Sequence, residues 1–204
     1  MRVQRGYLLC TIILNCLAVV VLGGCSQVVA RYPGVEIAER RPSAPQSLAK
    51  SAAHIVDKPM RLIIPSIQVD AMVEAVGVLA SGDLDTPRQN PWTDVGWYEA
   101  GPRPGQRGSA VMDGHLDRPG GFPAVFWNLR NIHAGDKITV IMSSGKKLLF
   151  HVTSFALYPP EEAPLQAIFG DGSGEYLNLI TCAGDWIPSQ HQTTLRMVVY
   201  ASSG

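Results

Sequence analysis

The chain has 204 residues, and its 17 lysines and arginines are balanced by 17 aspartates and glutamates, so the formal net charge is zero. Because no basic surplus exists to meet phosphates, the composition argues against binding of nucleic acid or of an acidic substrate. Twenty glycines and fifteen prolines among many Val, Ile and Leu residues are typical of a turn-rich β domain, and the length allows one such domain with appendages.

The N-terminal segment, residues 1–25, has the features of a membrane-targeting signal. Arg2 and Arg5 precede an apolar run over residues 7–22. This run is long for the core of a signal peptide and slightly short for a spanning helix, which needs roughly 17–25 residues. Leu22-Gly23-Gly24-Cys25 resembles the lipobox of bacterial lipoproteins, in which the cysteine receives lipid. The alternative is an uncleaved membrane anchor. Both interpretations predict a protein held at the cell membrane by its N-terminus, with the remaining chain extracellular.

Residues 26–58 lack hydrophobic periodicity and mix prolines with alanines, serines and a few charges. We therefore expect a flexible linker, which at this length typically spans on the order of 30 Å from end to end. Such a linker would hold a folded domain away from the membrane without setting its orientation. The folded domain is expected over residues 59–204.

Within this domain, short apolar segments alternate with turns rich in proline and glycine. We expect strands over residues 60–65, 67–70, 73–78, 108–115, 137–142, 147–157, 176–182 and 194–200. We expect loops over residues 86–105, 116–123 and 183–193, and short helices over residues 125–129 and 164–169. Strands of this length, joined by crossing loops, predict a mainly β fold with a closed or nearly closed barrel rather than a βαβ arrangement.

The strand expected over residues 176–182 ends on Cys182, which has no disulfide partner in the domain because the other cysteines lie near the N-terminus. Side chains alternate along a strand, so an inward Leu179 implies an outward Cys182, and an inward Met197 implies an outward Arg196. A hairpin would then bring an outward thiol and an outward guanidinium together. A lone cysteine beside a permanent cation is a candidate nucleophile, because the cation favours the thiolate.

Of the five histidines, His115 is the strongest candidate for chemistry because it follows a strand end and Gly114, where loops commonly carry functional groups. His191, in the expected loop after Cys182, could also lie near the site. The other three are expected in the linker (His54), in an exposed turn (His133) and as a structural residue on a strand (His151).

A metal site is the alternative for the segment around His115. Asp113, His115 and Asp117 occupy alternate positions and could together hold a cation. With one cysteine and no second histidine at ligand spacing, structural zinc is not expected. We therefore expect neither a metal nor a cofactor.

Three separated signatures resemble those of the sortases, which are bacterial cysteine transpeptidases. They are Asp113-Gly114-His115-Leu116-Asp117, Leu179-Ile180-Thr181-Cys182 and Leu195-Arg196, in that order. The resemblance covers roughly residues 60–201 and is closest to class F, with class E next. The class features are Gly96-Trp97-Tyr98 and Gly101-Pro102-Arg103-Pro104-Gly105. Cys25 is unusual for this group, whose members are more often held by a plain membrane helix.

The resemblance implies an eight-stranded β-barrel in which Cys182 ends one strand, Arg196 lies on the next and His115 follows a neighbouring strand. It implies that Cys182 attacks the Thr–Gly bond of an LPXTG-like sorting signal on a surface protein and forms a thioacyl intermediate. His115 would shuttle protons and Arg196 would hold the substrate backbone and the oxyanion. The acceptor would be an amine of a peptidoglycan precursor or of a pilin. Thr181 could donate its hydroxyl to the substrate, or pack inward as the alternation indicates.

Two other functions are compatible with parts of this pattern. L,D-transpeptidases are also wall-directed cysteine enzymes, but they resemble Ser-x-Gly-Cys-x-Arg, and here Arg196 follows Cys182 by fourteen residues. A non-catalytic cell-surface module could use the barrel as a binding platform. All three expected catalytic positions are occupied, which favours an enzyme.

Overall fold

The computed structural model describes residues 57–189 and 192–204, so the expected targeting segment and nearly all of the expected linker lie outside the described residues. The strands run in the order β1 (Pro59–Ile64), β2 (Val69–Val76), β3 (Val95–Tyr98), β4 (Gly108–Asp113), β5 (Asp117–Arg118), β6 (Phe122–Pro123), β7 (Lys137–Met142), β8 (Lys147–Tyr158), β9 (Glu175–Ile187) and β10 (Gln192–Ser203). The helices are the 3-10 turns η1 (Pro65–Ile67), η2 (Trp127–Asn131) and η3 (Pro160–Glu162), and the α-helix α1 (Leu165–Phe169).

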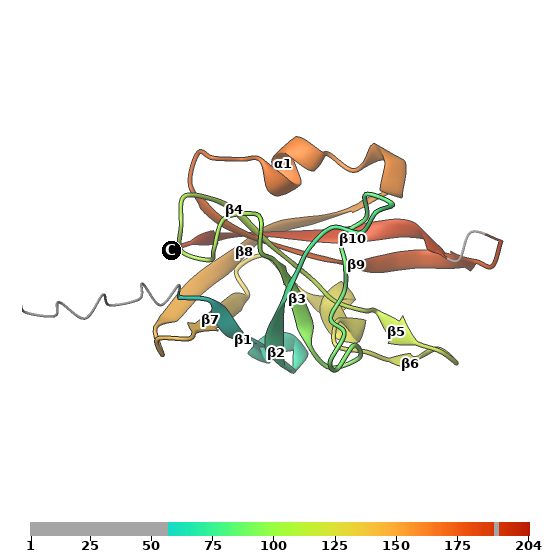
Figure 1. Ribbon diagram of the computed structural model, residues 1–204, viewed down its shortest axis with the longest axis horizontal. Coiled ribbons are helices and arrows are strands. Elements are labelled where there is room, and N and C mark those ends of the chain that lie inside the picture. Colours follow the sequence, from blue (N-terminus) through green and yellow to red (C-terminus); the bar gives the residue numbers. More distant parts are fainter. Residues whose placement is uncertain (1–56, 190–191) are drawn as a thin grey trace, which may run out of the picture. The chain divides into compact units, whose positions relative to one another are not determined.

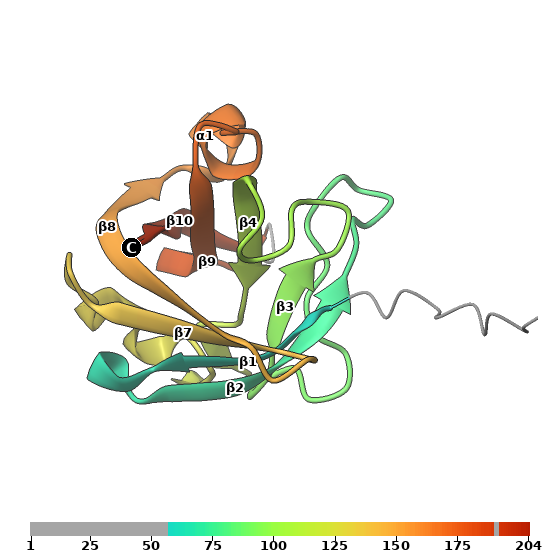
Figure 2. The ribbon, with the colours of Figure 1, turned by 90° about the vertical axis from the view of Figure 1, so that its left-hand side faces the viewer.

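Eight of these strands form a closed barrel in the order β1-β2-β3-β4-β9-β10-β8-β7, which confirms the expected fold (Figure 2). The pairs β2–β3 and β4–β9 are parallel, and the other pairs are antiparallel. The parallel β4–β9 pair joins segments far apart in the sequence, with Asp113 opposite Ile180. Closing the sheet leaves no unpaired edge along the barrel.

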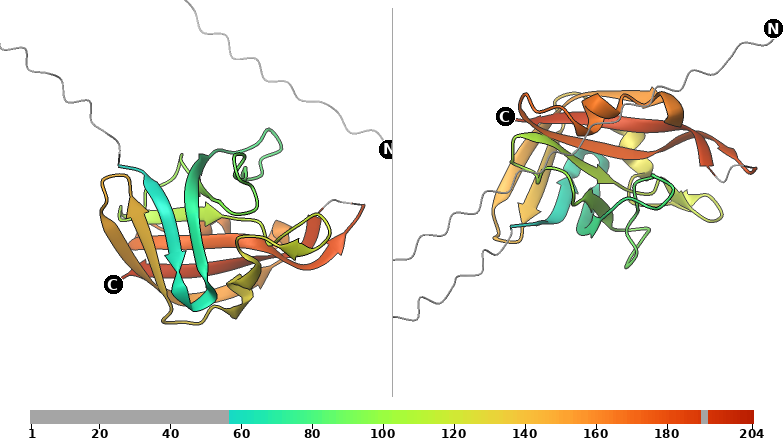
Figure 3. Two further views of the ribbon diagram at one scale, coloured as in Figure 1. Left: turned by 90° about the horizontal axis from the view of Figure 1, so that it is seen from below. Right: turned by 45° about the horizontal axis from the view of Figure 1, so that its top comes forward.

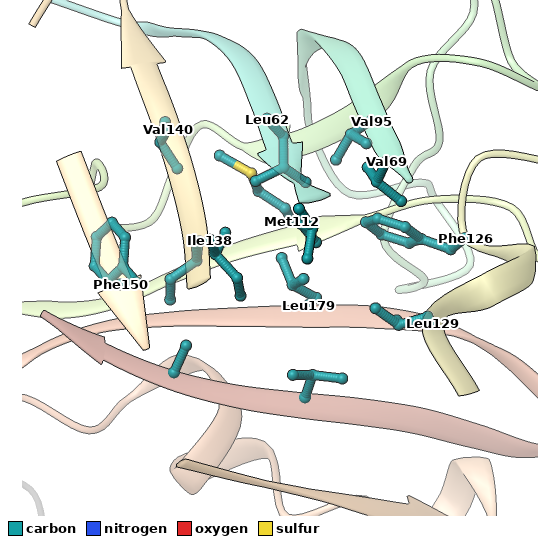
Figure 4. Packing of buried hydrophobic residues seen from close by; sticks show 14 of the residues in the cluster. Leu62, Val69, Val95, Met112, Phe126, Leu129, Ile138, Val140, Phe150 and Leu179 are labelled. Carbon is teal, nitrogen blue, oxygen red and sulfur yellow. The ribbon is translucent and has the colours of Figure 1, made fainter. Parts of the chain in front are cut away.

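The barrel interior is filled by apolar side chains from alternate strand positions, because residues two apart share one face of a strand (Figure 4). Burying each such side chain contributes about 1.5–3 kcal/mol. Leu177, Leu179, Met197 and Val199 are all buried there, as the alternation predicted. Among the core residues shown in Figure 4 are Leu62, Val69, Val95, Met112, Phe126, Leu129, Ile138, Val140 and Phe150.

A second apolar cluster covers the outer face of β4, β9 and β10. Val111, Ile168 and Val198 are buried in it, with Ile180 packed against them. Ile168 belongs to α1, which lies over these strands on the outside of the barrel (Figures 1 and 2). The outer face that carries Ile180 and Val198 is therefore apolar and covered by α1.

The expectation of a loop over residues 183–193 was wrong. β9 continues past Cys182 to Ile187, and β10 already begins at Gln192, so Cys182 lies within a long ribbon rather than at a strand end. Gly184, which suggested a loop, has a φ of +75° and forms a bulge at which the register shifts. A bulge absorbs an extra residue without ending the pairing, and glycine takes this backbone conformation without strain.

Three smaller expectations also differ from the structure. The segment 86–105, expected as loop, contains β3, which pairs in parallel with β2 and therefore depends on a distant partner. The segment 116–123, also expected as loop, contains the β5–β6 hairpin. The strand expected over residues 67–70 starts only at Val69, because Pro65 begins a 3-10 turn.

The β5–β6 hairpin and the distal part of the β9–β10 ribbon project from the same end of the barrel (Figures 1 and 3). The ribbon carries Cys182 and Arg196, and the hairpin follows His115 directly in the chain. The topology therefore places all three expected site residues at this end.

Candidate active site

Cys182 and Arg196 are direct partners across the β9–β10 ribbon. Both side chains are partly buried, and Cys182 is a free thiol. Ile180 and Val198, two residues away on the same strands, belong to the outer cluster, so Cys182 and Arg196 face outward as predicted. Residues opposite each other on one face of an antiparallel pair have Cβ atoms about 4.5–5.5 Å apart. The register therefore places Arg196 directly across the ribbon from Cys182.

The guanidinium of Arg196 is held by its own strand. Its Nη1 donates hydrogen bonds to the carbonyl oxygens of Thr193 (3.3 Å) and Leu195 (3.1 Å) and to Thr193 Oγ1 (3.0 Å). Within the described part of the chain, Nε and Nη2 donate to no protein group. The planar guanidinium is thus oriented by Nη1, while Nε and Nη2 can donate to a ligand.

Two hydrogen bonds tie Gly114, the residue before His115, to the part of β9 just before Cys182. Gly114 N donates to the carbonyl oxygen of Ile180 (3.2 Å), and Thr181 Oγ1 donates to the carbonyl oxygen of Gly114 (2.8 Å). Thr181 is buried, in agreement with its inward position in the alternation. Its hydroxyl is therefore already used to hold the neighbouring loop, and its expected contact with a substrate stays a prediction.

Glycine is required at position 114 because no side chain fits there. A Cβ at Gly114 would lie only 2.8 Å from side-chain atoms of Val125 and of Phe126. Both residues are packed into the barrel core just before η2. The backbone just before His115 is therefore packed closely against Val125 and Phe126.

His115 is partly buried against an aromatic ring. Its imidazole lies with its centroid 5.0 Å from that of Trp92, at an interplanar angle of 45°. Burial lowers the pKa of His115 below its usual value, and the charge of Asp117 opposes this shift. The site therefore favours a neutral imidazole, which can accept a proton near neutral pH.

Asp113, two residues before His115, carries a buried carboxyl group with one unpartnered oxygen. Its side chain lies over Gly96 of β3, its pairing partner, in space that a Cβ at residue 96 would occupy. Asp113 Oδ1 makes no hydrogen bond within the described residues. Burial raises the pKa of Asp113 to about 8, and the charge of Asp85 adds to the shift. The carboxyl is consequently protonated at neutral pH.

A cavity of about 280 Å³ adjoins Cys182. Its wall is formed by η2, the residue after His115, β8, β9 and β10, and the lining residues are Leu116, Arg130, Phe155, Leu157, Thr181, Cys182, Ala183, Gly184 and Met197. The lining is mostly apolar, and Arg130 is its one charged residue. A cavity with few polar groups beside a thiol suits a peptide or similar ligand.

The remaining histidines do not join this site within the described residues. His133 is exposed in a turn, and His151 lies on β8 opposite Lys137 and Ser202. His54 and His191 lie outside the described residues.

The alternative metal site at Asp113, His115 and Asp117 finds no support in the geometry. Residues 57–189 and 192–204 contain no group of three or more His, Cys, Asp or Glu side chains placed to hold a metal ion.

The described residues, 57–189 and 192–204, contain no helix that is long and apolar enough to span a membrane.

Sequence reasoning missed three residues of this region. Arg130 lies three residues after Trp127 on a 3-10 turn, where residues three apart overlie each other. This spacing could have indicated the stacking of Arg130 on the Trp127 ring. Trp92 lies in an irregular segment with no pattern that predicts its contact with His115. The burial of Asp113 could have been inferred from its place in a strand between apolar residues and a glycine.

Comparison with known proteins assigns this architecture to a family. The sortase domain matches residues 62–203. A sequence search of curated proteins found no match to the chain.

Solved structures of sortases share the fold. Sortase C1 of GBS Pilus Island 1 is 22% identical with a TM-score of 0.55, and the match covers 71% of this chain and 64% of that one. Sortase A from Corynebacterium diphtheriae is 19% identical with a TM-score of 0.57, covering 72% and 60%. Sortase C1 from Streptococcus suis is 20% identical with a TM-score of 0.57, covering 72% and 73%. The chain thus spans less than two thirds of the first and second of these proteins.

We expect the substitution Asp113→Asn to change how stability depends on pH. The unfolded carboxyl has a pKa near 3.9, whereas the folded pKa is about 8. Between these values the folded chain binds the additional proton, so the free energy of unfolding falls by about 1.4 kcal/mol for each pH unit gained. Asparagine removes this slope. Urea denaturation of both proteins at pH 5 and pH 8 measures this pH dependence. An equal change in the free energy of unfolding between the two pH values in both proteins would contradict the raised pKa of Asp113.

For His115, we expect Trp92→Ala to raise the pKa, because removing the ring exposes the imidazole to water. Asp117→Asn should lower it further, because the opposing charge is lost. The lowered pKa means that the neutral form stabilises the fold fully above about pH 6.5, and that this stability is lost as the pH falls through the folded pKa. NMR titration of the imidazole in each variant measures the shifts. Shifts of the same sign in both variants would refute this account.

Proposed function

Because this chain belongs to the sortase family, we propose that it is a cysteine transpeptidase whose nucleophile is Cys182, with His115 as proton shuttle and Arg196 as the cation that holds the oxyanion. The observation that carries the proposal is the register of β9 and β10, in which Arg196 lies directly opposite Cys182. The hydrogen bonds of Gly114 to Ile180 and Thr181 support the role of His115, because they hold the residue before His115 against the two residues that precede Cys182.

The first half-reaction forms a thioester. Cys182 Sγ gives its proton to neutral His115 and, as thiolate, attacks the carbonyl carbon of the threonine in an LPXTG-like signal, and negative charge develops on the carbonyl oxygen. Arg196 Nε and Nη2, which have no protein acceptor among the described residues, are free to donate to this oxygen. The C–N bond to glycine then breaks, and His115 gives its proton to the departing amine.

The second half-reaction transfers the acyl group. An amine acceptor gives a proton to neutral His115 as its nitrogen attacks the thioester carbon. The C–S bond breaks, the new amide forms, and Cys182 leaves as the thiolate. The low pKa of His115, caused by burial, favours the neutral imidazole that this step requires.

Within the family, we place the chain nearest to class F, with class E next. Support comes from the packing of the motif residues: Trp97 Nε1 donates to the carbonyl oxygen of Pro102 (3.3 Å), and a Cβ at Gly108 would lie 2.6 Å from the Pro102 ring. Gly96-Trp97-Tyr98 and residues 101–105, which carry the resemblance to class F, therefore pack together beside β4.

The proposed substrates are surface proteins that carry sorting signals, and the proposed acceptor is an amine of a peptidoglycan precursor or a pilin. We further place the enzyme at the cell membrane with its catalytic domain outside. The apolar run over residues 7–22 and the lipobox-like Cys25 support this location.

We expect Cys182→Ala to abolish transpeptidation while the domain stays folded, because losing one sulfur from a partly exposed site leaves little void. The assay incubates the detergent-solubilised full chain with fluorescent LPXTG-type peptides and amines, and circular dichroism reports folding. Residual turnover of even a few per cent would assign the nucleophile elsewhere. Peptide binding without turnover by the unaltered chain would favour a non-catalytic surface module.

The variant Arg196→Lys separates substrate positioning from a general effect of charge. Lysine keeps the positive charge but lacks the planar fork, so peptide cleavage should fall by roughly 10²–10³, the scale for one lost oxyanion donor. Alkylation of Cys182 by a small thiol reagent needs no substrate backbone and should change much less. Equal losses in both assays would show that Arg196 acts mainly on the thiol.

A further inference from the structure

We propose that the cavity between Cys182 and Arg130 binds the amine acceptor, and that Arg130 selects acceptors carrying an anionic group, a carboxylate or a phosphate. The inference rests on the proposed transpeptidase function and names the chemistry of its second substrate.

The two faces of the β9–β10 ribbon are chemically different. Cys182 and Arg196 face outward, where the sheet continues as the apolar surface of Ile180 and Val198 under α1. An acyl donor whose carbonyl meets both Cys182 and Arg196 must approach them from this outer face. The acceptor needs a separate approach, since the acyl chain still occupies the outer face when the thioester is attacked.

The cavity supplies that approach from the inner side of the ribbon. Thr181, Ala183 and Met197, which form part of its lining, have inward parity on β9 and β10. Leu116, the residue after His115, forms another part of the wall. An amine that enters here meets Cys182 and Leu116, and His115, the residue before Leu116, is the base that attack on the thioester requires.

Arg130 is a preorganised cation at the wall of this cavity. Its guanidinium carbon lies 4.0 Å from the centroid of the Trp127 ring, and its Nε donates to the carbonyl oxygen of Trp127 (3.1 Å). Stacking and this hydrogen bond orient the guanidinium and leave the two terminal nitrogens available. Because the side chain is already ordered, binding an anion costs less conformational entropy than for a free arginine.

Within the described residues, no carboxylate neutralises Arg130. The two ion pairs there join Arg61 to Asp70 and Arg88 to Asp85. Arg130 is exposed and lines a cavity whose other residues carry no charge. A planar guanidinium binds carboxylates and phosphates through two parallel hydrogen bonds, so an anionic group on the acceptor is its natural complement.

The test measures the second half-reaction with matched acceptors. The full chain in detergent is acylated by a sorting peptide whose C-terminus is amidated, so that the leaving segment carries no carboxylate. Triglycine and triglycine amide then compete as acceptors. We expect wild type to prefer triglycine by about tenfold in kcat/KM, which corresponds to about 1.4 kcal/mol for one charge-assisted contact.

Three variants assign the preference to Arg130. Arg130→Gln should abolish it, and Arg130→Glu should reverse it in favour of the amide, while the rate of thioester formation stays unchanged in both. The matched control is Arg118→Gln. Arg118 is also exposed and its Nε also donates to a backbone carbonyl, that of Pro123, but it does not line the cavity. This variant should keep the wild-type preference.

The outcomes separate this inference from the proposed function. Failure of every peptide to acylate Cys182 would reject the proposed function itself. Normal acylation with equal use of both acceptors, or with no acceleration by either acceptor, would overturn the role of the cavity and leave the transpeptidase chemistry standing. Slower acylation in Arg130→Gln would place Arg130 on the donor side or in the fold, and would equally overturn the inference.

Discussion

The structure of the candidate site depends on the register of the β9–β10 ribbon. Side chains alternate with a period of two, so a slip by one residue would turn Cys182 and Arg196 into the barrel and expose core residues. Leu177, Leu179, Met197 and Val199, all buried, resist such a slip because each contributes about 1.5–3 kcal/mol of burial. The same apolar contacts that hold the barrel together therefore keep Cys182 and Arg196 opposite each other on the outer face.

The parallel pairing of β4 with β9 positions the segment that carries His115, the third expected site residue. Thr181 and Gly114 are 67 residues apart in the chain, and their hydrogen bond joins β9 to the residue that follows β4. A segment as short as the one around His115 could not hold its position alone, because fixing each backbone residue costs about 1–2 kcal/mol in entropy. Gly114 makes the approach possible by having no side chain, and the buried Phe126 and the partly buried Val125 pack against it.

Charge in this region is divided between titratable groups and arginines. Burial lowers the pKa of His115 and raises that of Asp113, so both side chains favour their neutral forms near pH 7. Permanent positive charge comes from Arg196 on the outer face and from Arg130 at the cavity wall. A chain with no net charge can thus present two localised cations, each held by hydrogen bonds from its own side chain to nearby carbonyl oxygens. Such fixed charges need little reorganisation when a substrate binds.

The sequence by itself determined the strands with strong alternation, the barrel class, and the outward position of Cys182 and Arg196, because these follow from local periodicity. It also indicated His115, from a glycine and a histidine at a strand end. It misplaced β3 and the length of the β9–β10 ribbon, because pairing with a distant strand outweighs the local signal of Gly184 and of nearby prolines. Only the tertiary structure decided that Oδ1 of Asp113 has no hydrogen-bond partner among the described residues, that Trp92 packs on His115, and that Arg130 lines the cavity beside Cys182. These contacts join segments that are separate in the sequence, so no local pattern encodes them.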